Sequence, residues 1–294
     1  MMRNFNGYLK LINDNLMSYL PSKKILQKSV VDAMEYSLMA DGKRIRPVLT
    51  LAFCEVCGGD VLKALPFACA VEMIHTYSLI HDDLPCMDDD SLRRGKPANH
   101  VMNGEAMALL AGDALLTRAF EIMLCEETGN LVGADVAAKA ASCLAHNSGV
   151  LGMVGGQVID LESEGKKIDL AVLDEMHSLK TGALIIAAAK IGCIVAGADE
   201  AQIFAAENYA KSVGLAFQIM DDILDVTATS ENLGKNVGSD LAASKSTYVS
   251  IWGVEKSQQK VLELTDDAIN SLRVFNEDSG FLKNLALDLA KRNR

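Results

Sequence analysis

Apolar and polar residues do not alternate along this chain in the way that marks β-strands. Instead, long stretches rich in Ala, Leu, Met, Lys and Glu, which favour helices, are separated by short polar or glycine-containing breaks. No proline follows Pro97, so the last two thirds of the chain lack this helix breaker. The pattern predicts helices at residues 24–40, 43–57, 62–84, 99–125, 131–148, 169–180, 182–197, 199–226 and 246–274.

The breaks between the predicted helices are short. They fall at Asp41–Gly42, Gly58–Gly59, Leu92–Pro97, Thr128–Asn130, Gly165–Lys167 and Asn232–Ser239. Connections of this length favour antiparallel neighbours in a bundle. No linker, internal repeat or low-complexity tract divides the chain, so we expect one all-α domain over residues 1–294.

Composition narrows the class of protein. The chain has 294 residues, of which 50% are hydrophobic, so it can bury a large core. The net charge of −11 argues against nucleic acid as a partner. Its seven cysteines are scattered through apolar stretches, as buried thiols are in a reducing cytosol. We therefore expect a cytoplasmic protein without a disulfide framework.

Neither a targeting segment nor a membrane span is evident. The first 20 residues are interrupted by Asn and Asp and lack the apolar core of a signal peptide. The most membrane-like stretch is Ala183–Ala198, but Lys190 divides it and it is short for a span. We expect a buried core or subunit-interface helix there, in a soluble protein with no stable membrane insertion.

Two aspartate clusters dominate the chain, DDLPCMDDD at Asp82–Asp90 and DDILD at Asp221–Asp225. Each follows an apolar, helix-forming stretch, where carboxylates resist burial unless cations neutralise them. In the second cluster Asp221 and Asp225 are four residues apart and lie on one helix face. Mg²⁺ takes one or two carboxylates together with phosphate oxygens of a substrate. Two clusters facing each other would hold several Mg²⁺ ions around a diphosphate.

The first cluster needs a change of backbone direction to act on one ion. Asp82 and Asp88 are six residues apart, which places them on different faces of an ideal helix. Pro85 lies between them and interrupts the helical hydrogen bonds, so a local bulge could bring the two carboxylates together. The alternative is a solvated acidic loop. A calcium-binding loop is excluded because the alternating D-x-D-x-D-G spacing is absent.

Basic residues stand beside glycines or beside the acidic clusters, where they could clamp a diphosphate. They occur in GKRIRP, LRRGKP, LKTGAL, LGKNVGSD and ASKST, and are Lys43, Arg46, Arg93, Arg94, Lys180, Lys235 and Lys245. His75 lies seven residues before Asp82 and therefore shares its helix face. Ordinary surface charge is the alternative for any one of them. Nucleotide-binding glycine motifs and a serine nucleophile motif are absent.

These motifs together resemble the trans-type short-chain polyprenyl diphosphate synthases, and among them the bacterial farnesyl diphosphate synthases. The resemblance covers residues 42–248 in the order of the family. Its matching pieces are GKRIRP, EMIHTYSLIHDDLPCMDDDSLRRGKPANH, GDALL, GGQVIDL, LKTGAL, GLAFQIMDDILDV, LGKNVGSD and KSTY. It implies an all-α bundle around a central active-site cavity, a homodimer, and three Mg²⁺ ions in each active site.

The resemblance also implies two substrate sites. Isopentenyl diphosphate would be held by Lys43, Arg46, His75 and Arg94. The allylic diphosphate would be held through Mg²⁺ on Asp82, Asp88 and Asp221, supported by Asp83, Asp222 and Asp225. Its diphosphate would contact Arg93, Lys180, Lys235 and Lys245, while Thr181 and Gln218 would face the reacting carbons. Ser244 and Val249 depart from the glycine and proline that are common beside Lys245.

The expected activity is condensation of isopentenyl diphosphate with dimethylallyl and geranyl diphosphates to give farnesyl diphosphate. Tyr77 stands five residues before Asp82, about 7–8 Å along the helix axis, where it could form the floor of the product pocket. Ser78, four residues before Asp82, is too small to do so. The alternatives are a geranylgeranyl or longer-chain synthase and a non-catalytic subunit. Such subunits usually lose aspartates, and both clusters are intact.

Overall fold

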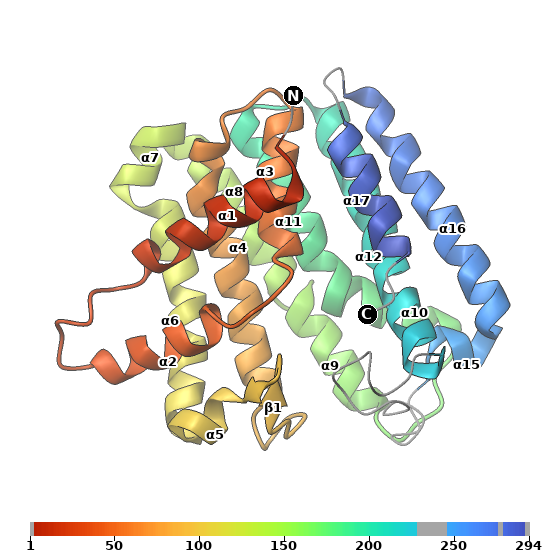
Figure 1. The fold of residues 1–294 in the computed structure, drawn as a ribbon, viewed down its shortest axis with the longest axis horizontal. Helices are drawn as coiled ribbons and strands as arrows, with labels where there is room; N and C mark the ends of the chain where they lie inside the picture. The colour runs from red at the N-terminus through yellow and green to blue at the C-terminus, as the bar shows by residue number, and fades with distance from the viewer. Residues whose placement is uncertain (1–2, 228–245, 276–278, 292–294) are drawn as a thin grey trace.

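The computed structural model describes residues 3–227, 246–275 and 279–291 (Figure 1). In these residues almost every regular element is a helix. The strands described are a two-residue pair, β1 (Leu92–Arg93) and β2 (Lys96–Pro97), which form a small antiparallel hairpin. The all-α fold expected from the sequence is confirmed.

Four helices make up the centre of the molecule: α3 (Ile45–Val56), α4 (Val61–Asp82), α11 (Ala183–Ala196) and α12 (Glu200–Thr227). α11 packs against the other three. Both α4 and α11 are apolar on nearly all sides, so they can be stable only where neighbours surround them. All four lie close to the ranges predicted for them.

Gly192 brings α11 unusually close to α3. A Cβ atom at this position would fall 2.3 Å from the carbonyl oxygen of Thr50, so no larger residue fits without a shift of the backbone. The close contact holds α3 against the middle of the bundle. Arg46 lies in the first turn of α3, so the contact at Gly192 also helps to position this predicted substrate residue.

The remaining helices surround this centre. Figure 1 shows α2, α4 and α6 side by side on one side of α11, and α12, α16 and α17 on the other. In chain order the further helices are α1 (Phe5–Leu16), α2 (Lys28–Leu38), α5 (Asn99–Asn103), α6 (Glu105–Leu124), α7 (Glu126–Val132), α8 (Ala134–Ser148), α9 (Met153–Ser163), α10 (Leu170–His177), α15 (Tyr248–Trp252), α16 (Val254–Ser271) and α17 (Gly280–Ala290). Short 3₁₀ turns follow α1 and α16, and a π-helical turn follows α10.

Several predicted helix boundaries are wrong, and glycine explains them. The predicted helix at 99–125 is divided at Gly104, and that at 246–274 is divided at Gly253. Conversely, the break predicted at 128–130 lies inside α7, which ends at Val132, directly before Gly133. All three glycines have φ between 78° and 94°, a backbone conformation that an L-residue rarely adopts.

Among the described residues, α1, α9 and α17 fall outside every predicted helix, as does most of α7. In α1 the side chain of Asn4 accepts a hydrogen bond from the backbone N–H of Gly7, so a residue that looked like an interruption caps the helix. α9 contains the pair Gly155–Gly156, and glycine is a poor helix former. Both glycines lie within the helix, where they allow close approach of other backbone segments.

One described stretch, Leu170–Ala196, is long and apolar enough to cross a membrane, with a mean hydropathy of 1.8. It comprises α10, the π-helical turn and α11. Most of its apolar part, 61%, is buried inside the structure. A buried core helix can have the same length and composition, and α11 packs against α3, α4 and α12.

Candidate active site

The first aspartate cluster begins where α4 ends. The backbone N–H of Asp88 donates to the carbonyl oxygen of Asp82 at 2.9 Å, and that of Asp89 donates to the carbonyl of Leu84 at 3.2 Å. Pro85 lies in the turn that these bonds close. The chain therefore folds back on itself, as the sequence suggested, and Asp88 returns to the end of α4 beside Asp82.

Burial and the negative charge of a neighbouring aspartate both raise the pKa of Asp82. Burial raises the pKa of its carboxyl to about 6, Lys180 opposes the rise, and neighbouring Asp88 adds to it. A carboxylate in this position is stabilised by a cation. Among the described residues no three His, Cys, Asp or Glu side chains form a ready-made metal site. Carboxylate oxygens such as those of Asp82 and Asp88 are donors that fit Mg²⁺, which binds through one or two carboxylates and completes its shell with water and phosphate oxygens.

Asp83 is buried and only 2% exposed. It forms an ion pair with the guanidinium of Arg93, which also bonds to Asp90 at 3.0 Å. Arg93 donates through Nε to Asp83 at 2.8 Å as well. This network ties the β1–β2 hairpin to the end of α4. The predicted contact of Arg93 with a diphosphate stays a prediction.

Lys180 and Thr181 lie in the π-helical turn η2 (Ser178–Gly182), between α10 and α11. Such turns widen the helix and are frequent at functional sites. The ammonium of Lys180 pairs with Asp160 on α9. Gly156, one helical turn earlier on α9, lies so close that a Cβ atom there would fall 2.1 Å from the backbone nitrogen of Lys180. α9 therefore holds both the backbone and the side chain of Lys180.

The second cluster lies on α12, opposite η2. Thr181 Oγ1 lies 3.4 Å from Gln218 Oε1, one turn before Asp221. Asp222 is buried, and its oxygens accept from Gln218 Nε2 at 3.5 Å and from the backbone N–H of Tyr248 at 2.8 Å. Asp222 thus anchors α12 to α15. Asp221 and Asp225 are partly exposed on the neighbouring face.

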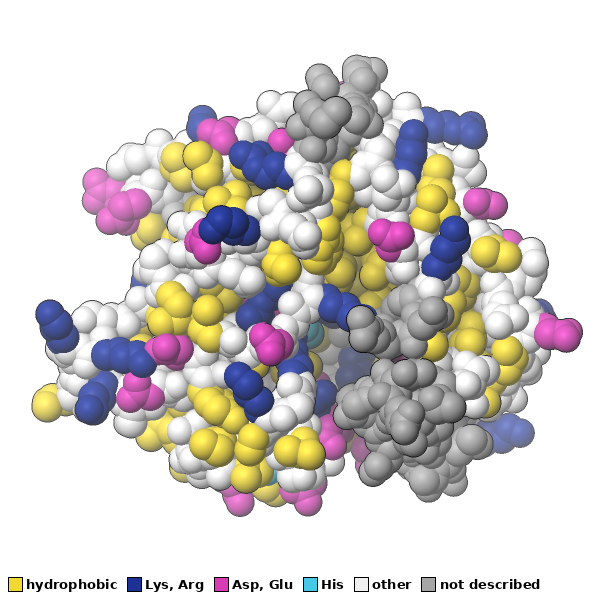
Figure 2. Space-filling view, viewed as in Figure 1, with side chains coloured by type: hydrophobic (Ala, Val, Ile, Leu, Met, Phe, Trp, Pro, Cys, Tyr) yellow, Lys and Arg dark blue, Asp and Glu magenta, His cyan; other side chains and the backbone are white. Residues whose placement is uncertain are grey.

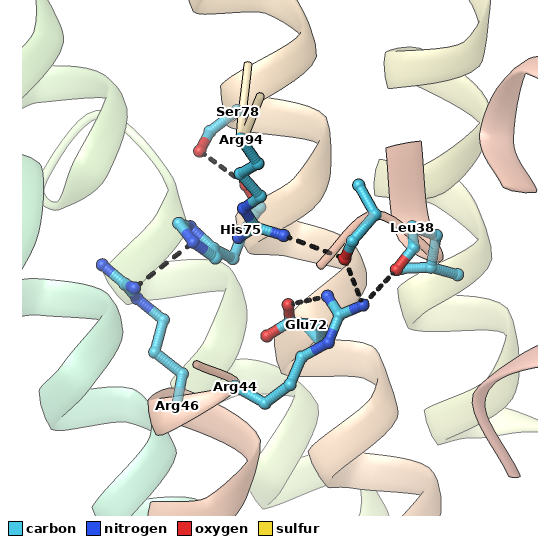
Figure 3. Close-up of polar contacts among 8 residues, drawn as sticks. Leu38, Arg44, Arg46, Glu72, His75, Ser78 and Arg94 are labelled. Atoms are coloured by element: carbon cyan, nitrogen blue, oxygen red, sulfur yellow. Dashed lines mark hydrogen bonds and ion pairs between the residues drawn. The ribbon is translucent and has the colours of Figure 1, made fainter. Parts of the chain in front are cut away.

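Three of the residues predicted to bind isopentenyl diphosphate lie together between α3, α4 and the hairpin (Figure 3). Arg46 Nη1 lies 3.4 Å from His75 Nε2, and Arg94 points toward the same region from above α4. Figure 2 shows Lys and Arg side chains around a hollow in the lower middle of this face. Lys43 is exposed on the loop before α3.

His75 is neutral in this arrangement. Burial lowers its pKa well below 6.5, and the positive charges of Arg46 and Arg94 lower it further. Because arginine can only donate, Nε2 of His75 accepts from Arg46 and the proton of the neutral ring lies on Nδ1. Burial also lowers the pKa of Arg46, to about 10, so this side chain stays charged at neutral pH.

Tyr77 and Ser78 lie on the last turns of α4. Tyr77 is 7% exposed, and its ring meets the imidazole of His81 edge to face at a centroid distance of 5.7 Å. His81 Nε2 is 3.0 Å from the carbonyl oxygen of Leu109 on α6. Ser78 is only partly buried and donates to the carbonyl of His75. Lys235 and Lys245 lie outside the described residues.

Sequence reasoning missed several residues that support the site: Arg44, Glu72, Gly156, Asp160, Asp174 and Tyr248. Two of them carried a signal. Glu72 and Asp160 are acidic residues in otherwise apolar helical stretches, and such a residue needs a cationic partner. Tyr248 gave no such signal, because its bonds to Asp222 and Asp174 depend on the tertiary fold.

Known proteins resemble this chain over almost its whole length. A polyprenyl synthetase family model matches residues 27–277. A geranylgeranyl diphosphate synthase of Cyanophora paradoxa is 48% identical, covering 96% of this chain and 98% of its own length. A dimethylallyltranstransferase of Fischerella ambigua is 45% identical, covering 97% and 86%. The crystal structure of an FPP/GFPP synthase from Zymomonas mobilis superposes with a TM-score of 0.86 at 36% identity, covering 97% of each chain.

Proposed function

Because the chain belongs to the polyprenyl synthetase family, we propose that it joins isopentenyl diphosphate to allylic diphosphates, head to tail. The observation that carries the proposal is the position of η2 between the two aspartate clusters. The positive charge of Lys180 lowers the pKa of Asp82 at the end of α4. Thr181 contacts Gln218, one turn before Asp221. One turn of backbone thus links both predicted metal-binding helices.

The reaction breaks the C1–O bond of the allylic diphosphate and releases diphosphate. The double bond of isopentenyl diphosphate then attacks C1, and a proton leaves the C2 position of the isopentenyl unit. Mg²⁺ ions, when bound, neutralise charge on the leaving diphosphate. Asp82, Asp88 and Asp221 would hold these ions, and Lys180 adds a positive charge beside them. No side chain described here is placed as an obvious base, so the departing diphosphate itself would accept the proton.

The carbocation needs acceptor dipoles and exclusion of water. The hydroxyl of Thr181 in η2 donates to Gln218 Oε1 on α12 at 3.4 Å, and the lone pairs of both oxygens can face positive charge. The amide of Gln218 is oriented by its second bond, to Asp222. This arrangement supports a role for both residues in stabilising positive charge at the reacting carbon.

Isopentenyl diphosphate would bind next to this site, at Lys43, Arg46, His75 and Arg94. A neutral His75 can donate through one ring nitrogen while the other accepts from Arg46. The three cations would match the charge of a diphosphate without a metal ion. Two substrates with different means of charge neutralisation then lie side by side.

The names of the relatives favour a twenty-carbon product over the farnesyl diphosphate expected from the sequence. Besides the enzyme of Cyanophora paradoxa, matching proteins of Arabidopsis thaliana are named geranylgeranyl synthases. We therefore place geranylgeranyl diphosphate first among the products. Farnesyl diphosphate is the second candidate, favoured by the buried ring of Tyr77 on the last turns of α4 and by the FPP/GFPP synthase structure.

We also propose a cytoplasmic homodimer without stable membrane insertion. All seven cysteines are free thiols, which suits a reducing compartment. α9 exposes Val154, Val158 and Leu161, spaced along one helix face, and Leu151 precedes them at 68% exposure. Apolar faces of this kind are commonly covered by a second subunit. Light scattering after size-exclusion chromatography measures the mass directly.

Product analysis tests the proposed activity. The purified protein is incubated with isopentenyl diphosphate, Mg²⁺ and, in separate reactions, dimethylallyl, geranyl or farnesyl diphosphate. We expect allylic products of fifteen or twenty carbons, and elongation of farnesyl diphosphate that stops at twenty carbons identifies a geranylgeranyl synthase. Absence of every elongated product from all three reactions would contradict the proposal and favour a non-catalytic subunit.

A further inference from the structure

Arg44 stands between two predicted substrate residues but turns the other way. Lys43 is exposed and Arg46 faces His75, whereas Arg44 is 5% exposed. Its backbone has φ 48°, in the left-handed region that non-glycine residues seldom adopt. This conformation at the start of α3 lets adjacent basic side chains leave the loop in different directions.

The guanidinium of Arg44 joins three elements (Figure 3). Nη1 forms an ion pair with Glu72 on α4, and Nη2 donates to the carbonyl oxygens of Leu38 at 2.6 Å and Ala40 at 2.9 Å. The side chains of the ion pair are 3% and 1% exposed. Because all of these groups are buried, Arg44 cannot leave its position without exposing or orphaning several polar groups.

The same groups border the site predicted for isopentenyl diphosphate. The Ala40 carbonyl also lies 3.5 Å from Arg94 Nη1. Gly42 leaves room for Arg94, because a Cβ atom there would fall 2.7 Å from its Nη1. Glu72 precedes His75 by one turn of α4. Arg44 therefore fixes the surroundings of the substrate residues and does not face the substrate.

This region holds more positive than negative charge. Arg44, Arg46 and Arg94 carry three positive charges, and Glu72 carries one negative charge. Because His75 is neutral, the net charge of the group is +2. Burial lowers the pKa of Arg46 and of Arg94, and in both cases the charge of Glu72 opposes that effect. Glu72 thus lies within electrostatic reach of all three arginines, yet its ion pair is with Arg44.

We propose that Arg44 is a positioning residue for isopentenyl diphosphate. It engages the buried Glu72 carboxylate, so that Arg46 and Arg94 stay available for the diphosphate, and it holds the loop that carries Lys43. Without Arg44, the nearest partners for Glu72 are the arginines that the substrate needs. The inference rests on the proposed function, since it concerns the binding of one of its substrates.

A pair of variants separates this role from a simple contribution to stability. Arg44→Met removes the partner of Glu72, and we expect the KM for isopentenyl diphosphate to rise at least about tenfold. The KM for the allylic substrate changes by less than about threefold. In Arg44→Met/Glu72→Gln the competing carboxylate is also gone, and we expect at least half of the lost affinity, on a logarithmic scale, to return.

Glu72→Gln alone gives the second test. It leaves Arg44 without its counterion, so thermal stability falls, but no carboxylate then competes for Arg46 or Arg94. The KM for isopentenyl diphosphate therefore stays within about threefold of wild type. If Arg44→Met does not fold, Arg44→Lys replaces it, with a smaller rise of the same KM. Lys190→Met, which breaks the ion pair to Glu207 between α11 and α12, is the control and leaves both KM values unchanged.

Three results would overturn the proposal: equal effects of Arg44→Met on both substrates, no recovery in the double variant, or a rise in KM for Glu72→Gln as large as for Arg44→Met. The first result indicates general structural damage, and the second indicates direct contact of Arg44 with the substrate. An inactive wild-type protein would instead contradict the proposed function. Active wild type with unaffected Arg44 variants would contradict this inference alone.

Discussion

Gly156 lies directly against the backbone of Lys180. A Cβ atom at position 156 would fall 2.1 Å from the Lys180 nitrogen and 2.6 Å from its Cα, so even alanine forces the two segments apart. Asp160, one turn further along α9, pairs with the Lys180 side chain. α9 thus sets the position of Lys180 in two ways: Gly156 lets its backbone approach, and Asp160 pairs with its ammonium group.

Gly156→Ala should therefore impair catalysis more than binding of isopentenyl diphosphate. The expected result is a fall in kcat of at least about tenfold, because small displacements of a catalytic group have large effects on rate. Gly129→Ala is the matched control, since no atom lies within 4 Å of a Cβ atom at that position on α7. Steady-state kinetics of the two variants provides the comparison. Full activity of Gly156→Ala would contradict the importance of this contact.

Asp82→Asn should inactivate the enzyme and stabilise the metal-free protein. Burial raises the pKa of Asp82 to about 6, so the folded state holds this proton more tightly than the unfolded chain. Its contribution to stability is complete below about pH 4 and is lost as pH rises through about 6. At pH 8 in EDTA the variant avoids an ionised buried carboxylate, a difference of about 3 kcal/mol.

Thermal unfolding in EDTA at several pH values measures this effect. The melting temperature of Asp82→Asn should exceed that of wild type at pH 8, and the gap should shrink toward pH 5. Addition of Mg²⁺ and an allylic diphosphate should stabilise wild type more than the variant. If the variant were less stable than wild type at pH 8, ionised Asp82 would not destabilise the metal-free protein, and the prediction would be wrong.

The two substrate sites should respond separately to mutation. Arg46→Ala removes a predicted phosphate contact beside His75, so the KM for isopentenyl diphosphate should rise at least about tenfold. Lys180→Ala should instead lower kcat or raise the KM for the allylic substrate, because Lys180 acts beside Asp82. Kinetics with each substrate varied in turn distinguishes the two. Equal effects of both variants on both substrates would exclude separate sites.

Tyr77→Ala should lengthen the product by at least one five-carbon unit. Each added unit buries apolar surface worth on the order of 4 kcal/mol, so elongation stops only where the pocket is blocked. The ring of Tyr77 is held against His81, which is fixed to α6, so it is rigid enough to block. Tyr77→Phe keeps the ring and should keep the product length. An unchanged product from Tyr77→Ala would place the floor of the pocket elsewhere.

The parts of the fold that could be predicted are those encoded locally. The apolar stretches of the sequence predict α4 and α12, and the aspartates at their ends indicate a cation site. Glycine gave contradictory signals. Gly253 ends a helix at positive φ, whereas Gly156 lies inside one and marks a close contact. Sequence alone does not distinguish the two, because the second role depends on a segment 24 residues away.

Roles that depend on distant partners could not be predicted either. Arg44 and Arg46 look alike in GKRIRP, and only the fold shows that one meets Glu72 inside the protein and the other meets His75. Asp222 in DDILD is expected to support the metal site, but the sequence does not show which groups it bonds to. In the structure both of its oxygens accept hydrogen bonds from the protein, which favours a supporting role.

The central claim is condensation of two diphosphates at a site that needs both aspartate clusters. The most direct measurement is the ratio of diphosphate released to isopentenyl units incorporated, for wild type and Asp221→Ala, with and without Mg²⁺. We predict one diphosphate released for each unit added, only when Mg²⁺ and both substrates are present, and loss of the reaction in Asp221→Ala. Diphosphate release from the allylic substrate alone at the same rate, or undiminished condensation by Asp221→Ala, would contradict the account.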